Sequence, residues 1–155
     1  MIDLLAGGAS SVARAVTFPT GASTPYDEQF SYQESLAARG DISGALESYE
    51  ALISERPTAI FPRTRAAEHY ARDGSDPARA AELFRQVRAL PNASSSDVRY
   101  ASSRLVDLYD GPLADPGRAL VELRRIIELY PDSPLARHAR TALPRLKQRL
   151  GAEQA

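Results

Sequence analysis

The middle of the chain repeats one pattern of apolar and polar positions three times. In each copy a small residue is followed four positions later by a large apolar residue, three positions further by another, and then by a proline. The 3.6-residue period of an α-helix places the first three on one face, and proline ends a helix. We therefore predict three helices, each with one buried stripe. The copies are Ala45, Tyr49, Leu52 and Pro57; Ala80, Phe84, Val87 and Pro91; and Ala119, Leu123, Ile126 and Pro131.

A further helix-like stretch precedes each copy and is separated from it by turn residues at 39–41, 73–77 and 110–116. In these turns glycine accepts the left-handed backbone that ends many helices, aspartate caps the next helix, and proline is tolerated in its first turn. The predicted unit is therefore helix, turn, helix. The last helix is predicted to begin near Asp132-Ser133-Pro134, and Pro144 is expected to kink or split it.

These units resemble tetratricopeptide repeats, and the resemblance covers about residues 25–150. The spacing is 35 residues from Ala45 to Ala80 and 39 from Ala80 to Ala119, which brackets the family period of about 34. In the resemblance, Tyr32 and Leu36 take apolar places on the first helix of the first unit. The implied fold is all-α, a helix-hairpin solenoid of three units with a C-terminal capping helix.

The resemblance also implies a binding face, because tetratricopeptide proteins line a concave groove with the first helix of each pair. The alternative is a solvated face with weak Arg65–Glu68 and Arg104–Asp107 pairs at i,i+3 spacing. Relatives that clamp a carboxylate use Lys, Arg and Asn in this groove, so the acidic residues argue against that ligand. The mapped positions are Asp27, Phe30, Ser31, Glu34, Phe61, Thr64, Arg65, Glu68, Tyr100, Ser103, Arg104 and Asp107. The candidate partner-binding residues among them are Phe30, Glu34, Phe61, Arg65, Glu68, Tyr100, Arg104 and Asp107.

The first 18 residues carry an apolar pattern of their own, with only Asp3 and Arg14 charged. On a helix several of their aliphatic side chains share one face, and no run here approaches the roughly 20 apolar residues of a bilayer span. Three interpretations stay open: docking against a membrane-associated partner, packing on the chain's own repeats, or a disordered or processed segment. The candidate docking residues are Ile2, Leu5, Val12, Val16 and Phe18.

The predicted organisation is therefore an N-terminal segment at 1–18, a linker at 19–24, a repeat domain at 25–150 and a tail at 151–155. We expect the first helix of the domain to begin around Thr24-Pro25-Tyr26-Asp27, where a cap is followed by a first-turn proline and a carboxylate.

The sequence contains few residues or motifs that are typical of an enzyme. It contains no cysteine, and its two histidines, His69 and His138, fall in different predicted helices. No phosphate-binding loop, metal-ligand spacing or nucleophile motif occurs. We therefore expect no catalytic activity, metal or cofactor. A net charge of −1 also argues against a nucleic-acid partner.

These features together predict a non-enzymatic protein–protein interaction scaffold, an accessory or stabilising subunit of a larger complex. The apolar N-terminal segment suggests that this complex lies at a membrane, with the chain on the cytoplasmic face. The kind of complex that we consider is a bacterial bioenergetic one, photosynthetic or respiratory, and this choice rests on no sequence motif. The alternative is a soluble peptide-binding adaptor. Lys147 is the only lysine among the 19 basic residues, and the others are arginine. We interpret this bias as the mark of a bacterial source with GC-rich codons.

Overall fold

The computed structural model describes residues 30–73 and 76–153, and all regular structure in these ranges is helical. The predicted all-α class is therefore confirmed. The predicted start at residues 24–27 and the segment 1–18 lie outside the described residues. The helices are α1 (Ser31–Ala38), α2 (Ile42–Glu55), α3 (Ile60–Arg72), α4 (Pro77–Ala89), α5 (Ser95–Asp110), α6 (Pro116–Leu129) and α7 (Pro134–Glu153).

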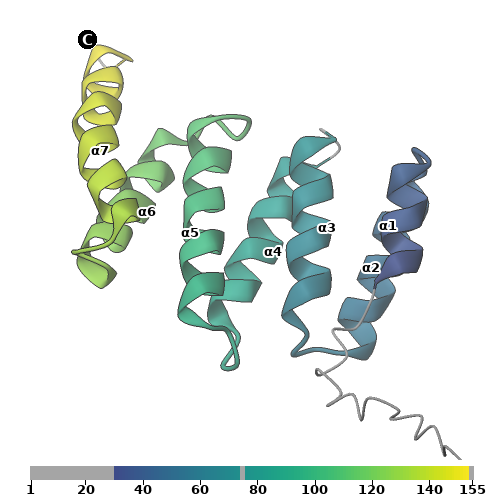
Figure 1. The fold of residues 1–155 in the computed structure, drawn as a ribbon. Helices are drawn as coiled ribbons and strands as arrows, with labels where there is room; N and C mark the ends of the chain where they lie inside the picture. The colour runs from purple at the N-terminus through teal and green to yellow at the C-terminus, as the bar shows by residue number, and fades with distance from the viewer. Residues whose placement is uncertain (1–29, 74–75, 154–155) are drawn as a thin grey trace, which may run out of the picture.

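The helices form a stack of hairpins in which each helix packs against its neighbours in sequence (Figure 1). The helices α1, α3, α5 and α7 form one row, and α2, α4 and α6 form a second row behind it. We call the exposed side of the first row the front face. The three hairpins and the final helix agree with the predicted solenoid of three units and a capping helix.

Aspartate caps begin the second helix of every hairpin, as the turn sequences predict. The side chains of Asp41, Asp76 and Asp115 each accept a hydrogen bond from the backbone N–H three residues further on. Ser94 and Asp97 form a reciprocal capping box at the start of α5. Each such cap is worth about 1 kcal/mol, so the hairpin geometry is fixed locally.

Some local predictions need correction. Gly40 takes the left-handed conformation with φ +85°, but Gly111 has φ −101°, and Ala114 takes positive φ in that turn. Pro144 does not split the last helix, because α7 runs through it to Glu153 and includes most of the predicted tail.

The core is built from the repeated stripe. Tyr49, Phe84 and Leu123 are buried, as predicted, and the small residues that precede them lie fully inside the stack. Alanine at these points lets neighbouring helix backbones approach closely, while the larger side chain fills the space between rows. The stripe therefore joins all three hairpins into one continuous core.

On α1 the predicted apolar position at Tyr32 is wrong. Tyr32 is 65% exposed, whereas the neighbouring Gln33 is buried and its side-chain amide donates a 2.8 Å hydrogen bond to Ser48 on α2. Leu36 is half-buried. The helix is therefore rotated by about one residue, or about 100°, from the orientation expected from its apolar pattern.

Candidate interaction surface

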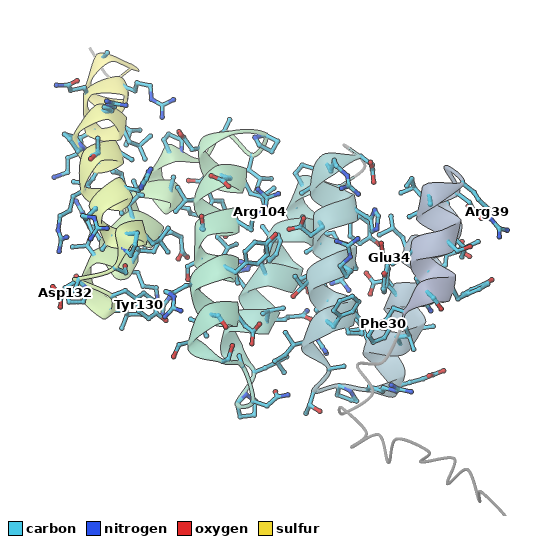
Figure 2. All side chains as sticks on the ribbon, in the orientation of Figure 1. Phe30, Glu34, Arg39, Arg104, Tyr130 and Asp132 are labelled. Carbon is cyan, nitrogen blue, oxygen red and sulfur yellow. The ribbon has the colours of Figure 1, made fainter. Side chains whose placement is uncertain are left out.

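The first step of the front face is closed by an ion pair between α1 and α3. The Arg65 guanidinium donates two hydrogen bonds to the Glu34 carboxylate, at 2.7 and 2.6 Å. The buried Tyr49 hydroxyl donates to the same carboxylate. Hydrogen bonding by Arg65, reinforced by Tyr49 and opposed by desolvation, lowers the pKa of Glu34 to about 2. Figure 2 shows Glu34 reaching from α1 toward α3.

Aromatic stacking closes the same step below this ion pair. The rings of Phe30 and Phe61 lie 4.4 Å apart, centroid to centroid, at an interplanar angle of 12°. Phe30 also lies 6.5 Å from the Tyr49 ring, which ties it to the core. Phe61 remains 46% exposed. Two of the predicted binding aromatics therefore stack on each other, although Phe61 keeps nearly half of its surface exposed.

The second step, from α3 to α5, is closed in a similar way. The Tyr100 hydroxyl donates to Glu68, and Arg104 lies 3.4 Å from the same carboxylate. Burial first, and the hydrogen bond to Glu68 second, raise the pKa of Tyr100 to about 12. The Tyr100 ring also meets the buried Phe84 edge-on at 6.1 Å. Figure 2 shows Arg104 on the side of α5 that faces α3.

Of the two i,i+3 pairs in the solvated-face alternative, one forms and the other does not. That alternative pairs Arg65 with Glu68 along α3, but each instead pairs across to a neighbouring helix. Arg104 does pair with Asp107 on its own helix, at 3.1 Å. The prediction failed for Arg65 because helical spacing gives only partners on the same helix, whereas Glu34 lies 31 residues away in sequence.

The second row is joined by a similar series of inter-hairpin pairs. Glu50 on α2 accepts two hydrogen bonds from Arg79 on α4, at 2.9 and 2.7 Å, and hydrogen bonding by Arg79 lowers the pKa of Glu50. Arg88 on α4 pairs with Glu122 on α6, where both side chains are largely buried. Such charge-assisted bonds fix the offset between successive hairpins.

Most of the predicted front-face residues thus contact one another. We call this region the paired section and define it by the residues that the contacts above join. These are Phe30, Glu34, Phe61, Arg65, Glu68, Tyr100 and Arg104.

The last step of the front face, between α5 and α7, is hollow. Two adjoining pockets of about 300 and 400 Å³ share Val106, Leu123 and Ala142 as lining residues. The buried side chains of Leu123 and Ile126 on α6 form the floor. We call this hollow the terminal groove; its remaining lining residues are Ser103, Asp107, Asp110, Leu135, His138, Ala139, Arg145, Leu146 and Arg149.

The charges around the terminal groove are unequal. Asp110 on α5 pairs with Arg149 on α7, and Asp107 pairs with Arg104. Arg145 is exposed, and it has no ion-pair or hydrogen-bond partner within 30–73 and 76–153. Between residues 134 and 152, α7 carries five Arg and Lys side chains and no carboxylate. The α7 wall is therefore positive.

Sequence reasoning missed most of this groove, since only Ser103 and Asp107 among the mapped positions line it. The signal that could have found it was the last helix, where apolar residues at Leu135 and Ala142 alternate with arginines. The resemblance assigns that helix only the role of a C-terminal cap.

The two histidines lie apart. His69 is 1% exposed; its Nδ1 lies 3.3 Å from Asp73, and its ring lies 6.1 Å from the Tyr49 ring. His138 is exposed and borders the terminal groove. In the described part of the chain no three metal-binding side chains gather, and none of its helices has the length and apolar character of a membrane span.

The predicted docking residues Ile2, Leu5, Val12, Val16 and Phe18 lie outside the described residues. No protein-family model and no curated protein matches the chain.

Proposed function

We propose that this protein is a non-enzymatic interaction scaffold that uses the terminal groove to hold a protein partner. The observation that carries the proposal is the pair of adjoining pockets between α5 and α7, whose walls include the partly exposed apolar residues Val106, Leu135 and Ala142. Concave sites with an apolar lining and a few polar groups are the usual form of binding sites. Arginine is enriched at protein–protein interfaces, and the groove places Arg145 and Arg149 beside apolar side chains. This composition supports the same function.

We further propose that the stack belongs to the tetratricopeptide type. The hairpin units, the buried alanine at the same place in each second helix and the aspartate-capped turns support this assignment. Fold alone does not fix function. The tetratricopeptide assignment therefore supports a protein as the ligand, and the groove supports the place where that protein binds.

The finer part of the proposal is that the scaffold is an accessory subunit of a larger, membrane-associated assembly, such as a bacterial bioenergetic complex. The apolar pattern of residues 1–18 supports it. Burying four aliphatic side chains there would contribute roughly 1.5–3 kcal/mol each, before the ordering cost of the segment. If this gain exceeds the ordering cost, the segment would attach the scaffold to its assembly at a second point, in addition to the groove.

The test is co-purification of the tagged full chain from its native cells in mild detergent, beside a chain that lacks residues 1–18. We expect the full chain to bring the same protein partners in repeated preparations, and the shortened chain to lose a membrane-associated partner while it keeps its melting temperature. A fall in melting temperature would show instead that the segment packs on the repeats. Full retention of the partner would contradict the anchor.

The second candidate is a soluble peptide-binding adaptor, which the terminal groove favours equally. Cell fractionation separates the two candidates: an assembly subunit sediments with a large membrane complex, whereas an adaptor stays in the soluble fraction. For either candidate the chain has no turnover of its own. A reproducible reaction that His69→Ala or His138→Ala abolishes would contradict this part of the proposal.

A further inference from the structure

We infer that the terminal groove binds a short extended segment of a partner protein that carries aliphatic side chains flanked by carboxylates. The inference rests on the proposed scaffold function and adds the chemistry of the partner. It follows from the dimensions of the groove, its floor and the charges of its two walls.

The dimensions of the groove select a short segment. The α5 wall runs from Ser103 to Asp110 and the α7 wall from Leu135 to Arg149. At 1.5 Å per helical residue these walls are about 10 and 21 Å long. An extended chain advances about 3.3 Å per residue, so the groove accommodates about three to six residues.

The floor selects aliphatic side chains. Leu123 lines both pockets, and Val106 and Ala142 stand on opposite walls above it. An apolar side chain inserted between these walls removes both surfaces from water, and this gain is roughly proportional to the apolar area covered. The pockets adjoin along the groove, so two side chains of an extended segment, pointing the same way at alternate positions, can enter together.

The charges select carboxylates beside those side chains. The acidic groups on the α5 wall already have cationic partners, since Asp110 pairs with Arg149 and Asp107 pairs with Arg104, which Glu68 also contacts. Arg145 borders the groove without a partner among the described residues, and Arg137, Arg140 and Lys147 add positive charge on the same helix. A carboxylate next to the buried aliphatic group would meet Arg145 at the rim, whereas a cationic segment would meet repulsion.

The paired section explains why this chemistry does not extend along the whole front face. Arg65 is already committed to Glu34, and Arg104 to Glu68 and Asp107. A ligand carboxylate there would have to displace an internal one. At the terminal groove nothing among the described residues has to be displaced from Arg145.

The test measures fluorescence anisotropy of labelled hexapeptides with the full chain. The acidic probe is Glu-Leu-Leu-Asp-Leu-Glu; one control replaces its acidic residues with lysine, and another replaces its leucines with serine. We expect the acidic leucine peptide to bind most tightly and to weaken as salt is raised. Equal binding of the lysine peptide would overturn the charge assignment, and equal binding of the serine peptide would overturn the apolar one.

Matched variants locate the site. Arg145→Glu should weaken the acidic probe about five- to tenfold, because it replaces one attraction with a repulsion. Arg140→Glu makes the same charge change on the same helix outside the groove lining and should have a much smaller effect. Equal losses would show that only the general charge of α7 matters, and would overturn the groove as the site.

A second pair of variants tests the apolar floor. Ala142→Phe should fill the groove and abolish binding, whereas Ala51→Phe, on the exposed side of α2, should leave it unchanged. Melting curves show whether each variant is folded. If Ala142→Phe does not fold, the comparison of Arg145→Glu with Arg140→Glu decides the question. Unchanged binding by folded Ala142→Phe would overturn the proposal.

The chain's own Ile2-Asp3-Leu4-Leu5 has the same chemistry and is the main competing occupant. If it fills the groove, Leu5→Asp in the full chain should bind the probe more tightly than the unmodified chain; that result would overturn a separate partner as the occupant. The co-purification described above does not depend on the peptide result. A partner that co-purifies with folded Arg145→Glu as well as with the unmodified chain would refute this inference and leave the scaffold function standing.

Discussion

The paired section and the terminal groove occupy the same face of the same stack, yet one is closed and the other is hollow. In the paired section Glu34 and Arg65 make a two-point contact, and Phe30 stacks on Phe61 above the core. Within residues 30–73 and 76–153, the Asp110–Arg149 pair is the only ion pair that joins α5 to α7, and it lies at one end of the groove.

The difference teaches that a helical stack can make a binding site by leaving one step unfilled. Long side chains at the first two steps reach across and contact one another. At the third step the residues that would have to reach across are short, Ser103 and Ala142, so a hollow remains above the buried floor. The same backbone arrangement thus gives a closed surface at one end and a hollow with a largely apolar lining at the other.

The largest effect is expected beneath the paired section. Phe84 is fully buried and supports Tyr100, so Phe84→Ala should lower the free energy of unfolding by about 3–5 kcal/mol. Leu135→Ala, in the groove lining, should cost only about 1 kcal/mol because its side chain is already half-exposed and leaves no closed cavity. Urea unfolding measures both. Equal losses would contradict the contrast between a closed and a hollow region.

A smaller effect, with a pH dependence, is expected at the first step. Arg65 keeps the pKa of Glu34 near 2 in the folded state, below its ordinary value of 4.5. A depressed folded pKa stabilises the fold above the unfolded value, and this contribution is lost as pH falls from about 4.5 toward 2. Glu34 is 38% exposed, so solvent screening reduces the contribution to about 1 kcal/mol.

Arg65→Met should therefore destabilise the protein by about 1 kcal/mol at pH 7 and by much less at pH 3. Arg145→Met should change stability by less than about 0.5 kcal/mol at either pH, since it breaks no contact among the described residues. Urea titrations at the two pH values give the comparison. A pH-independent loss for Arg65→Met would mean that Arg65 stabilises by packing its alkyl chain.

The features that the sequence predicted well are those with local causes. The helical stripes containing Tyr49 and Phe84 depend on a 3.6-residue period, and the caps at Asp41 and Asp115 depend on contacts three residues away. Both act within one helix or turn. They can be recognised without knowing the tertiary arrangement.

The features that the sequence did not predict are contacts between hairpins. Glu50 could pair with any of several arginines, and only the stack places Arg79 beside it. The exposure of Tyr32 depends on how α1 is rotated against α2, and a short helix with few apolar residues does not fix this rotation. The terminal groove was missed for the same reason, because its walls come from helices separated by α6.

The smallest expected effect concerns the ion pair that crosses the terminal step, which has a counterpart in the paired section. Asp110–Arg149 joins α5 to α7 as Glu34–Arg65 joins α1 to α3, but its side chains are more exposed. A double-mutant cycle with Asp110→Asn and Arg149→Gln should give a coupling energy of about 0.2–1 kcal/mol that disappears in 1 M salt. The Glu34→Gln and Arg65→Met cycle should give a larger value that salt reduces less, because its two-point geometry and the Tyr49 hydrogen bond hold the partners together. If the two cycles gave equal energies with equal salt dependence, the terminal step would be as firmly closed as the first, and the groove would not be the exceptional region of the front face.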